Sequence, residues 1–77
     1  MDDLYKKLKF KARRGMLELD LILNNYLLNN YALMSSDLKQ QFDKLMDLTD
    51  PELWDLLVVK SVKPERRLQE IVAAILD

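Results

Sequence analysis

The chain has 77 residues, 49% of them hydrophobic, and a formal net charge of −1, which indicates one soluble domain with a packed core. It contains no cysteine and no histidine, which excludes disulfides, the usual zinc, haem and iron–sulfur sites, and Cys–His or Ser–His nucleophilic catalysis. A domain this small is also not expected to enclose a deep pocket, so we predict a protein that is not an enzyme and binds no metal or cofactor itself.

Charge is unevenly distributed along the chain. Residues 1–14 hold six basic and two acidic residues, whereas residues 15–77 hold six basic and eleven acidic residues. No segment approaches the roughly 20 apolar residues that span a bilayer, and the basic N-terminus lacks the apolar segment of a secretory signal. We therefore expect a cytoplasmic protein with a basic N-terminal element on an acidic body.

Apolar residues recur at helical spacing along most of the chain, and strand signals are weak. The first predicted helix covers residues 3–13, and Gly15 is expected to end it because glycine tolerates the left-handed conformation beyond a helix terminus. The second covers residues 16–28, and its apolar residues lie on several sides, which predicts a central, buried helix. Residues 31–34 form an apolar link that we expect to pack against the core.

The remaining predicted helices cover residues 36–47, 51–59 and 64–76. The third helix starts after Ser35 or Ser36, either of which can accept hydrogen bonds from the free amides of the first turn. The fourth is predicted from Asp50 as its N-cap and Pro51 as its first helical residue. Together these patterns predict an all-α fold, a compact five-helix bundle in which residues 1–77 form a single domain.

Residues 12–20, with the sequence ARRGMLELD, carry the most specific signal in the chain. Gly15 leaves room for the backbone of a partner, and Arg14 and Glu18 would place a guanidinium and a carboxylate beside it. The same residues also fit a structural interpretation, in which Gly15 caps a helix and Arg14 and Glu18 form a surface ion pair worth at most about 0.5 kcal/mol. The residues alone leave both interpretations open.

Two segments resemble a known family. Residues 13–20 resemble the RGxxE signature of the succinate dehydrogenase flavinylation factors. Residues 42–54 resemble that family's segment of a helix, an acidic-proline turn and a second helix opening on an aromatic residue. The two segments occur in the family's order and spacing, and the resemblance covers residues 5–76.

The resemblance implies a five-helix assembly factor that binds the flavoprotein subunit of succinate dehydrogenase and promotes its covalent FAD attachment. In some members of the family the partner is the flavoprotein subunit of fumarate reductase. FAD would then be bound by the partner and not by this chain, which we expect to be a monomer when free. The family's RGxxE residues lie at or near the partner contact, so the resemblance carries this role to Arg14, Gly15 and Glu18. We expect Arg13, Met16 and Asp20, from the same extended motif, to share in partner binding.

Other functions remain alternatives. Some bacterial members of the family have been labelled antitoxins, so one alternative is an antitoxin or another small protein-binding adaptor. The basic residues within residues 1–14 can contact phosphates, but the acidic body and the lack of a helix-turn-helix signature argue against a nucleic-acid partner. Residues 4–10 also fit a basic amphipathic surface for lipid headgroups, but an apolar stripe facing the core with solvated lysines explains them better, and we predict no stable membrane insertion.

Overall fold

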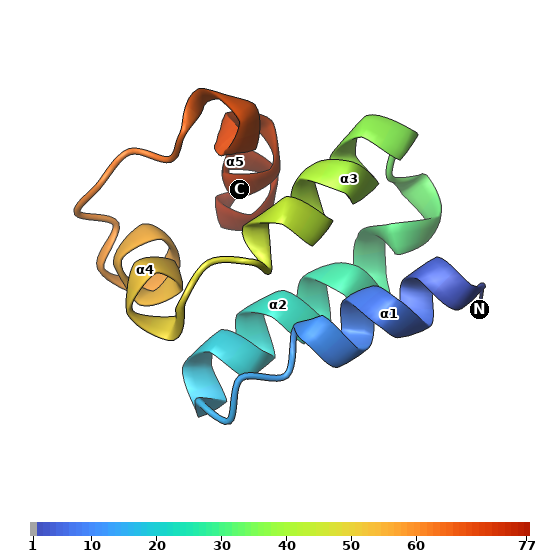
Figure 1. Cartoon of the computed structure of the whole chain (residues 1–77), viewed down its shortest axis with the longest axis horizontal. Helices are drawn as coiled ribbons and strands as arrows, with labels where there is room; N and C mark the ends of the chain where they lie inside the picture. Colours follow the sequence, from blue (N-terminus) through green and yellow to red (C-terminus); the bar gives the residue numbers. More distant parts are fainter. Residues whose placement is uncertain (1) are drawn as a thin grey trace.

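The computed structural model describes residues 2–77, and this part of the chain contains five α-helices and no β-strand (Figure 1). The helices are α1 (Asp3–Lys11), α2 (Leu17–Asn30), α3 (Ser36–Leu45), α4 (Asp50–Trp54) and α5 (Gln69–Leu76). The predicted all-α, five-helix fold is therefore confirmed. Met1, which the predicted domain includes, lies outside the described residues.

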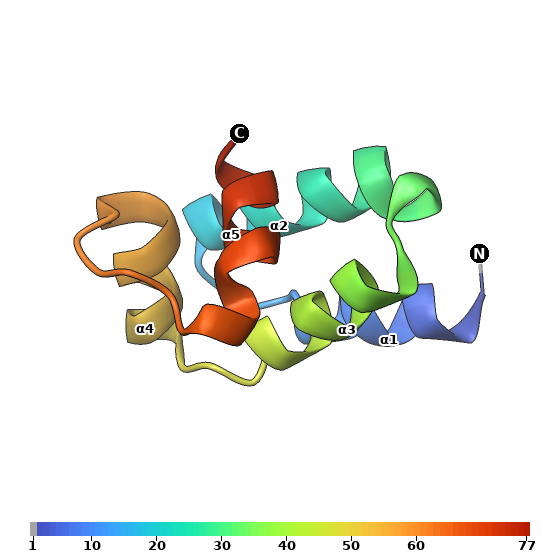
Figure 2. The same cartoon turned by 90° about the horizontal axis from the view of Figure 1, so that it is seen from above.

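The helices enclose the core from several directions. α1 and α2 run antiparallel, and α3 packs against α1 (Figure 1). α5 runs across the bundle and contacts both α2 and α3 (Figure 2). α4 continues into a π-helical turn, Asp55–Val59, and lies at the same end of the molecule as the loop that joins α1 to α2 (Figure 1).

Every helix contributes to one hydrophobic core. Leu8 of α1, Leu23 of α2, Phe42 of α3, Leu53 of α4 and Ile71 of α5 are completely shielded from solvent. Burying a side chain of this size stabilises the fold by about 1.5–3 kcal/mol relative to leaving it exposed. Within residues 2–77 no charged residue is buried, so the core itself is held by apolar packing.

The prediction that α2 is buried on all sides is wrong. Its buried face consists of Leu19, Leu23 and Leu27, at four-residue spacing, whereas Leu17, Leu21 and Leu28 are more than half exposed. The physical reason is size, because a domain of 77 residues is too thin to cover a helix on every side. The outer side of α2 therefore presents leucines to solvent.

The polar residues of α2 also make it longer than predicted. It begins at Leu17 and continues to Asn30 rather than ending at residue 28. The Asn24 side-chain amide donates to the carbonyl of Asp20 at 2.9 Å, and that of Asn30 donates to the carbonyl of Tyr26 at 3.0 Å. These asparagines bond back within the helix instead of ending it.

The link between α2 and α3 packs against the core only in part. Tyr31 and Met34 are buried as expected, but Leu33 is 85% exposed. Tyr31–Leu33 form a 3-10 turn, and the tight turn directs these neighbouring side chains to different sides. The link fastens α2 to the core through Tyr31 and Met34 alone.

Two helix starts differ from the sequence prediction. Thr49, not Asp50, is the N-cap of α4, because its side chain accepts from the Glu52 amide while the Glu52 carboxylate accepts from the Thr49 amide. α5 begins at Gln69 rather than near residue 64. The polar residues before Leu68 are mostly exposed, so they lack the packing that stabilises a short helix, and a 3-10 turn, Arg66–Leu68, precedes α5.

Two further helix ends lie earlier than predicted. α1 ends at Lys11 with Ala12 as its C-cap, so the expectation that Gly15 ends this helix is wrong. Ala12 is fully buried, and its place in the core fixes the point at which the chain leaves the helix. α3 begins after Ser35, whose side chain accepts from the Leu38 amide at 3.1 Å, and it ends at Leu45 rather than at residue 47.

The two faces of α2 allow a direct test of the core. We predict that Leu23→Ala lowers the free energy of unfolding by about 2–5 kcal/mol, because it removes packing from a fully buried site. Leu21→Ala, the same change on the exposed side of the same helix, should cost less than about 1 kcal/mol. Urea denaturation followed by circular dichroism measures both values. Equal losses would mean that the assigned faces of α2 are wrong.

Candidate functional site

The loop of residues 12–16 joins α1 to α2 and holds the chain's single glycine. Gly15 has a φ of +75°, a left-handed conformation that glycine adopts without steric cost. A Cβ built at this position would have no atom of the described residues within 4 Å, apart from those of its chain neighbours. The backbone at Gly15 is therefore open to an approaching partner.

The Arg14 side chain turns inward, which corrects the expectation of a guanidinium presented beside Gly15. It is only 15% exposed. Nη1 donates to the carbonyl of Leu48 at 3.1 Å and lies 3.4 Å from the Asp50 carboxylate, and Nη2 donates to the carbonyl of Met46. The two carbonyls belong to the turn that follows α3, where free backbone acceptors carry partial negative charge. The guanidinium thus fastens the loop to the end of α3 and to the start of α4.

Asp20 also faces the loop. Its Oδ1 accepts a hydrogen bond from the backbone amide of Arg14 at 2.7 Å, and this connects the loop to the first turn of α2. Within residues 2–77 no ion pair joins Arg14 to Glu18, so the surface pair considered in the sequence analysis does not form. Arg14 is held by its side chain on one side and by its amide on the other.

The outward residues around this loop are Arg13, Gly15, Leu17 and Glu18, and we call this surface the loop face. Leu17 is 74% exposed, so this surface includes a large apolar side chain as well as charged ones. Met16, the remaining predicted contact residue, is half-buried and packs against the core. The loop face combines an open backbone, an apolar side chain and charges of both signs, which is a composition suited to binding a protein.

Phe10 extends this surface along α1, although the sequence analysis considered it only for a lipid surface. It is 76% exposed and, with Lys6, Lys9 and Arg13, lines a surface hollow of about 240 Å³. The sequence does contain a signal, because Phe10 lies two residues from Leu8 and thus on the opposite side of the helix from the buried face. An exposed aromatic residue among basic side chains suits a protein contact.

The other two lysines of α1, Lys7 and Lys11, form ion pairs within the protein. Lys11 Nζ lies 2.6 Å from Asp43 and 2.9 Å from Asp47, and Lys7 lies 3.4 Å from Asp43. The hydrogen bond from Lys11 to the Asp43 carboxylate is the main cause that lowers the pKa of this carboxyl group. Burial acts to lower the pKa of Lys11, but its hydrogen bonds to Asp43 and Asp47 outweigh burial and leave that pKa raised. This charge cluster fastens α1 to α3.

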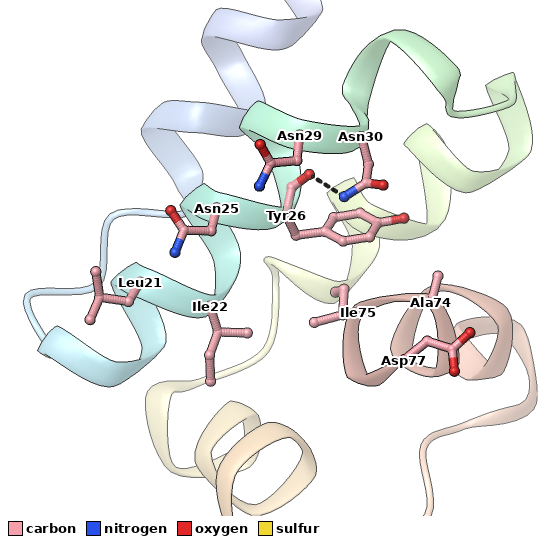
Figure 3. Close-up of a pocket in the computed structure, with 9 residues that line it drawn as sticks. All are labelled: Leu21, Ile22, Asn25, Tyr26, Asn29, Asn30, Ala74, Ile75 and Asp77. Carbon is pink, nitrogen blue, oxygen red and sulfur yellow. Dashed lines mark hydrogen bonds between the residues drawn. The ribbon is translucent and has the colours of Figure 1, made fainter.

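A second hollow lies on α2, beside the end of α5, with a volume of about 580 Å³ (Figure 3). Ile22 and Ile75 contribute apolar walls, while Asn25 and Asn29 project from α2. The dashed line in Figure 3 is the bond from Asn30 to the Tyr26 carbonyl. The predicted partner-binding residues are not among those that line this hollow.

Within residues 2–77 there is no group of three or more acidic, histidine or cysteine side chains placed to hold a metal ion. None of the helices in the described part of the chain combines the length and apolarity that crossing a membrane requires. Of the apolar side chains considered for lipid binding, Tyr5 and Leu8 face the core, whereas Leu4 and Phe10 are exposed.

Comparison with known proteins points to one family. A family model described as "Flavinator of succinate dehydrogenase" matches residues 6–77. A protein of Legionella pneumophila (strain Lens), named FAD assembly factor SdhE, is 40% identical over 69 residues, which cover 90% of this chain and 86% of the relative. The protein of the same name from Francisella tularensis is 43% identical over 72 residues, covering 91% of this chain and 73% of the relative. That of Coxiella burnetii is 33% identical over 70 residues, covering 91% and 85%. No solved structure matches the chain.

The charge cluster between α1 and α3 predicts a pH-dependent stability. The lowered pKa values of Asp43 and Asp47 mean that their contribution is present above their ordinary value of 3.8 and is lost as the pH falls through the lowered values. We predict that Lys11→Met destabilises the protein by about 1 kcal/mol near neutral pH, and that this loss shrinks as the pH falls below 3.8 through the lowered pKa values. Thermal unfolding from pH 2 to pH 8 measures the difference.

Lys9→Met is the matched control, because Lys9 is an exposed residue of the same helix. It should leave the stability nearly unchanged at every pH. A loss for Lys11→Met that persists undiminished at pH 2 would show that Lys11 acts through packing rather than through its ion pairs.

Proposed function

Because the chain belongs to the succinate dehydrogenase flavinator family, we propose that it binds the flavoprotein subunit of succinate dehydrogenase and promotes covalent FAD attachment to it. The family model covers all but the first five residues, and the named assembly factors match over 90–91% of the chain. The resemblance carried by residues 13–20 and 42–54 is thereby confirmed as membership of this family.

We propose the loop face as the surface that contacts the flavoprotein. The observation that carries this proposal is the open, left-handed backbone at Gly15, flanked by the exposed side chains of Leu17 and Glu18. Without a Cβ at Gly15, a backbone segment of the partner can approach closely and hydrogen-bond there. Leu17 supplies apolar area to such a contact, while Arg13 and Glu18 orient it by pairing with opposite charges.

In this proposal the protein supplies geometry and no chemistry of its own. Any cysteine or histidine that bonds to the flavin must belong to the flavoprotein, because this chain has neither residue. FAD is bound by the flavoprotein, which the assembly factor holds in the arrangement that places the flavin beside its acceptor. Tighter binding to that arrangement than to others raises its population, and this suffices to accelerate attachment without an enzyme active site.

Three further properties belong to the same proposal. The flavoprotein subunit of fumarate reductase is a second partner, the protein acts in the cytoplasm, and it is a monomer until it meets a flavoprotein. Nucleic acid is a poor partner, because three of the six basic residues in the N-terminal segment, Lys7, Lys11 and Arg14, are engaged within the protein.

Two substitutions at Gly15 test the loop face. Gly15→Ala and Gly15→Arg impose a similar backbone penalty, about 1–2 kcal/mol for a left-handed conformation, but only arginine extends far from the surface. We predict that Gly15→Arg abolishes covalent flavinylation and weakens binding by at least about a hundredfold, which is roughly 3 kcal/mol. Gly15→Ala should retain measurable activity. The assay combines purified apo-flavoprotein subunit, FAD and each variant, with in-gel flavin fluorescence as the readout and calorimetry for affinity.

The two variants separate contact from backbone strain. Equal losses in both would assign the effect to the conformation of Gly15 rather than to a partner's approach. Undiminished flavinylation with Gly15→Arg would exclude the loop face as the contact surface. Thermal unfolding of each variant confirms that both are folded at the assay temperature.

A further inference from the structure

We propose that Arg14, Asp20 and Asp50 are positioning residues, which hold the loop of residues 12–16 in its binding shape and do not themselves contact the flavoprotein. This inference rests on the proposed function, in which the loop face is the contact surface. It changes the role of two residues, Arg14 and Asp20, that the extended motif predicts to take part in partner binding.

The Arg14 side chain has little accessible surface and few free donors with which to bind a partner. Its side chain is 85% covered, and its two terminal nitrogens are already directed at two backbone carbonyls and the carboxylate of Asp50. A carboxylate of the flavoprotein could bind the guanidinium only by breaking these bonds and entering the space beneath the loop. Arginine forks give specific contacts because their geometry is fixed, and here that geometry is used within the chain.

The loop is held at a single residue, Arg14, by contacts in three directions. The side chain of Arg14 connects it to the turn after α3 and to Asp50 of α4, and the Arg14 amide connects it to Asp20 of α2. Gly15 follows immediately and is the most freely rotating residue type in a chain. Fixing the residue before Gly15 therefore sets the direction in which the open backbone faces.

A loop that is fixed before binding increases the affinity for the flavoprotein. A loop that is already in its bound shape loses little conformational freedom on association, whereas a loose loop must be ordered at the expense of binding free energy. The loop face is small, so avoiding this ordering cost forms a large part of the binding free energy that it can supply. Loss of an anchor should therefore weaken binding even though the anchor lies outside the contact.

Asp20 gives the sharpest test, because its side chain can lose its charge and still keep its acceptor. Asp20→Asn retains an oxygen that can accept the Arg14 amide, whereas Asp20→Ala retains none. A positioning role predicts that Asp20→Asn binds the apo-flavoprotein within about threefold of wild type, and that Asp20→Ala binds about five- to tenfold more weakly. A direct charged contact predicts that both variants weaken binding together.

A second pair of variants tests the anchor from the far end. Asp50→Ser removes the carboxylate next to Arg14 but leaves the loop face untouched, and it should also weaken binding by a few-fold. Asp55→Ser is its control, because Asp55 is an exposed acidic residue that follows α4. It removes the same charge from the same part of the chain and should bind like wild type.

Amide hydrogen exchange supplies a readout that loss of a contact would not change. In the free protein, exchange of the Arg14 amide, which donates to Asp20, should be faster in Asp20→Ala and Asp50→Ser than in wild type, while the Leu23 amide in the core exchanges at an unchanged rate. Equal loss of binding in both Asp20 variants, without faster exchange in the loop, would overturn this inference and leave the proposed function intact. Failure of the wild-type protein to bind the apo-flavoprotein would overturn both.

Discussion

The structure around the candidate site depends on the contact between the Arg14 guanidinium and the carbonyls of Met46 and Leu48, which lie 32 and 34 residues further along the chain. The end of α3 leaves backbone acceptors without helical donors, and the loop after α1 has no secondary structure to hold it. The Arg14 side chain donates to these acceptors and thereby also holds the loop in place. Because the same residue donates its amide to Asp20, the loop, the end of α3 and the start of α2 are fixed together. The orientation of the open backbone at Gly15 follows from this arrangement.

The thinness of the domain explains why large apolar side chains lie on its surface. The chain buries one apolar cluster, and the helices around it cannot cover one another's outer sides. Phe10 on α1 and the outward leucines of α2 are therefore exposed, although their residue types are typical of cores. The hollows at the surface are lined by such residues together with lysines or asparagines. In the proposed function, the protein acts through the shape and charge of this exterior.

The sequence predicted the five helices because each has an apolar repeat that also faces the core. The buried stripe of Leu19, Leu23 and Leu27 is an example, and the outer leucines of α2 misled the prediction because composition does not record which side is covered. The N-cap of α4 was misplaced by one residue because Thr49 and Asp50 are both good caps, and only the reciprocal bond with Glu52 distinguishes them. At the site, the RGxxE motif located the loop. It could not show that Arg14 points inward, because the acceptors that attract it come from a distant part of the sequence.

The size of the loop face bears on how the protein can bind. A standard protein interface buries about 800 Å² on each partner, which is roughly a sixth of the 5110 Å² that this chain exposes. Four residues cannot supply that area, so a contact of standard size must extend beyond the loop face. We propose that it continues along the outer side of α1, where Phe10 and Arg13 line the adjoining hollow. Helix α1 is itself fixed to α3 by the Lys11 ion pairs with Asp43 and Asp47, and the loop is fixed by Arg14. Both anchors lie outside the proposed contact surface, and α3 with the turn that follows it supports both of them. A contact that spans the two parts gains affinity from this shared support, because neither part has to be ordered when the complex forms.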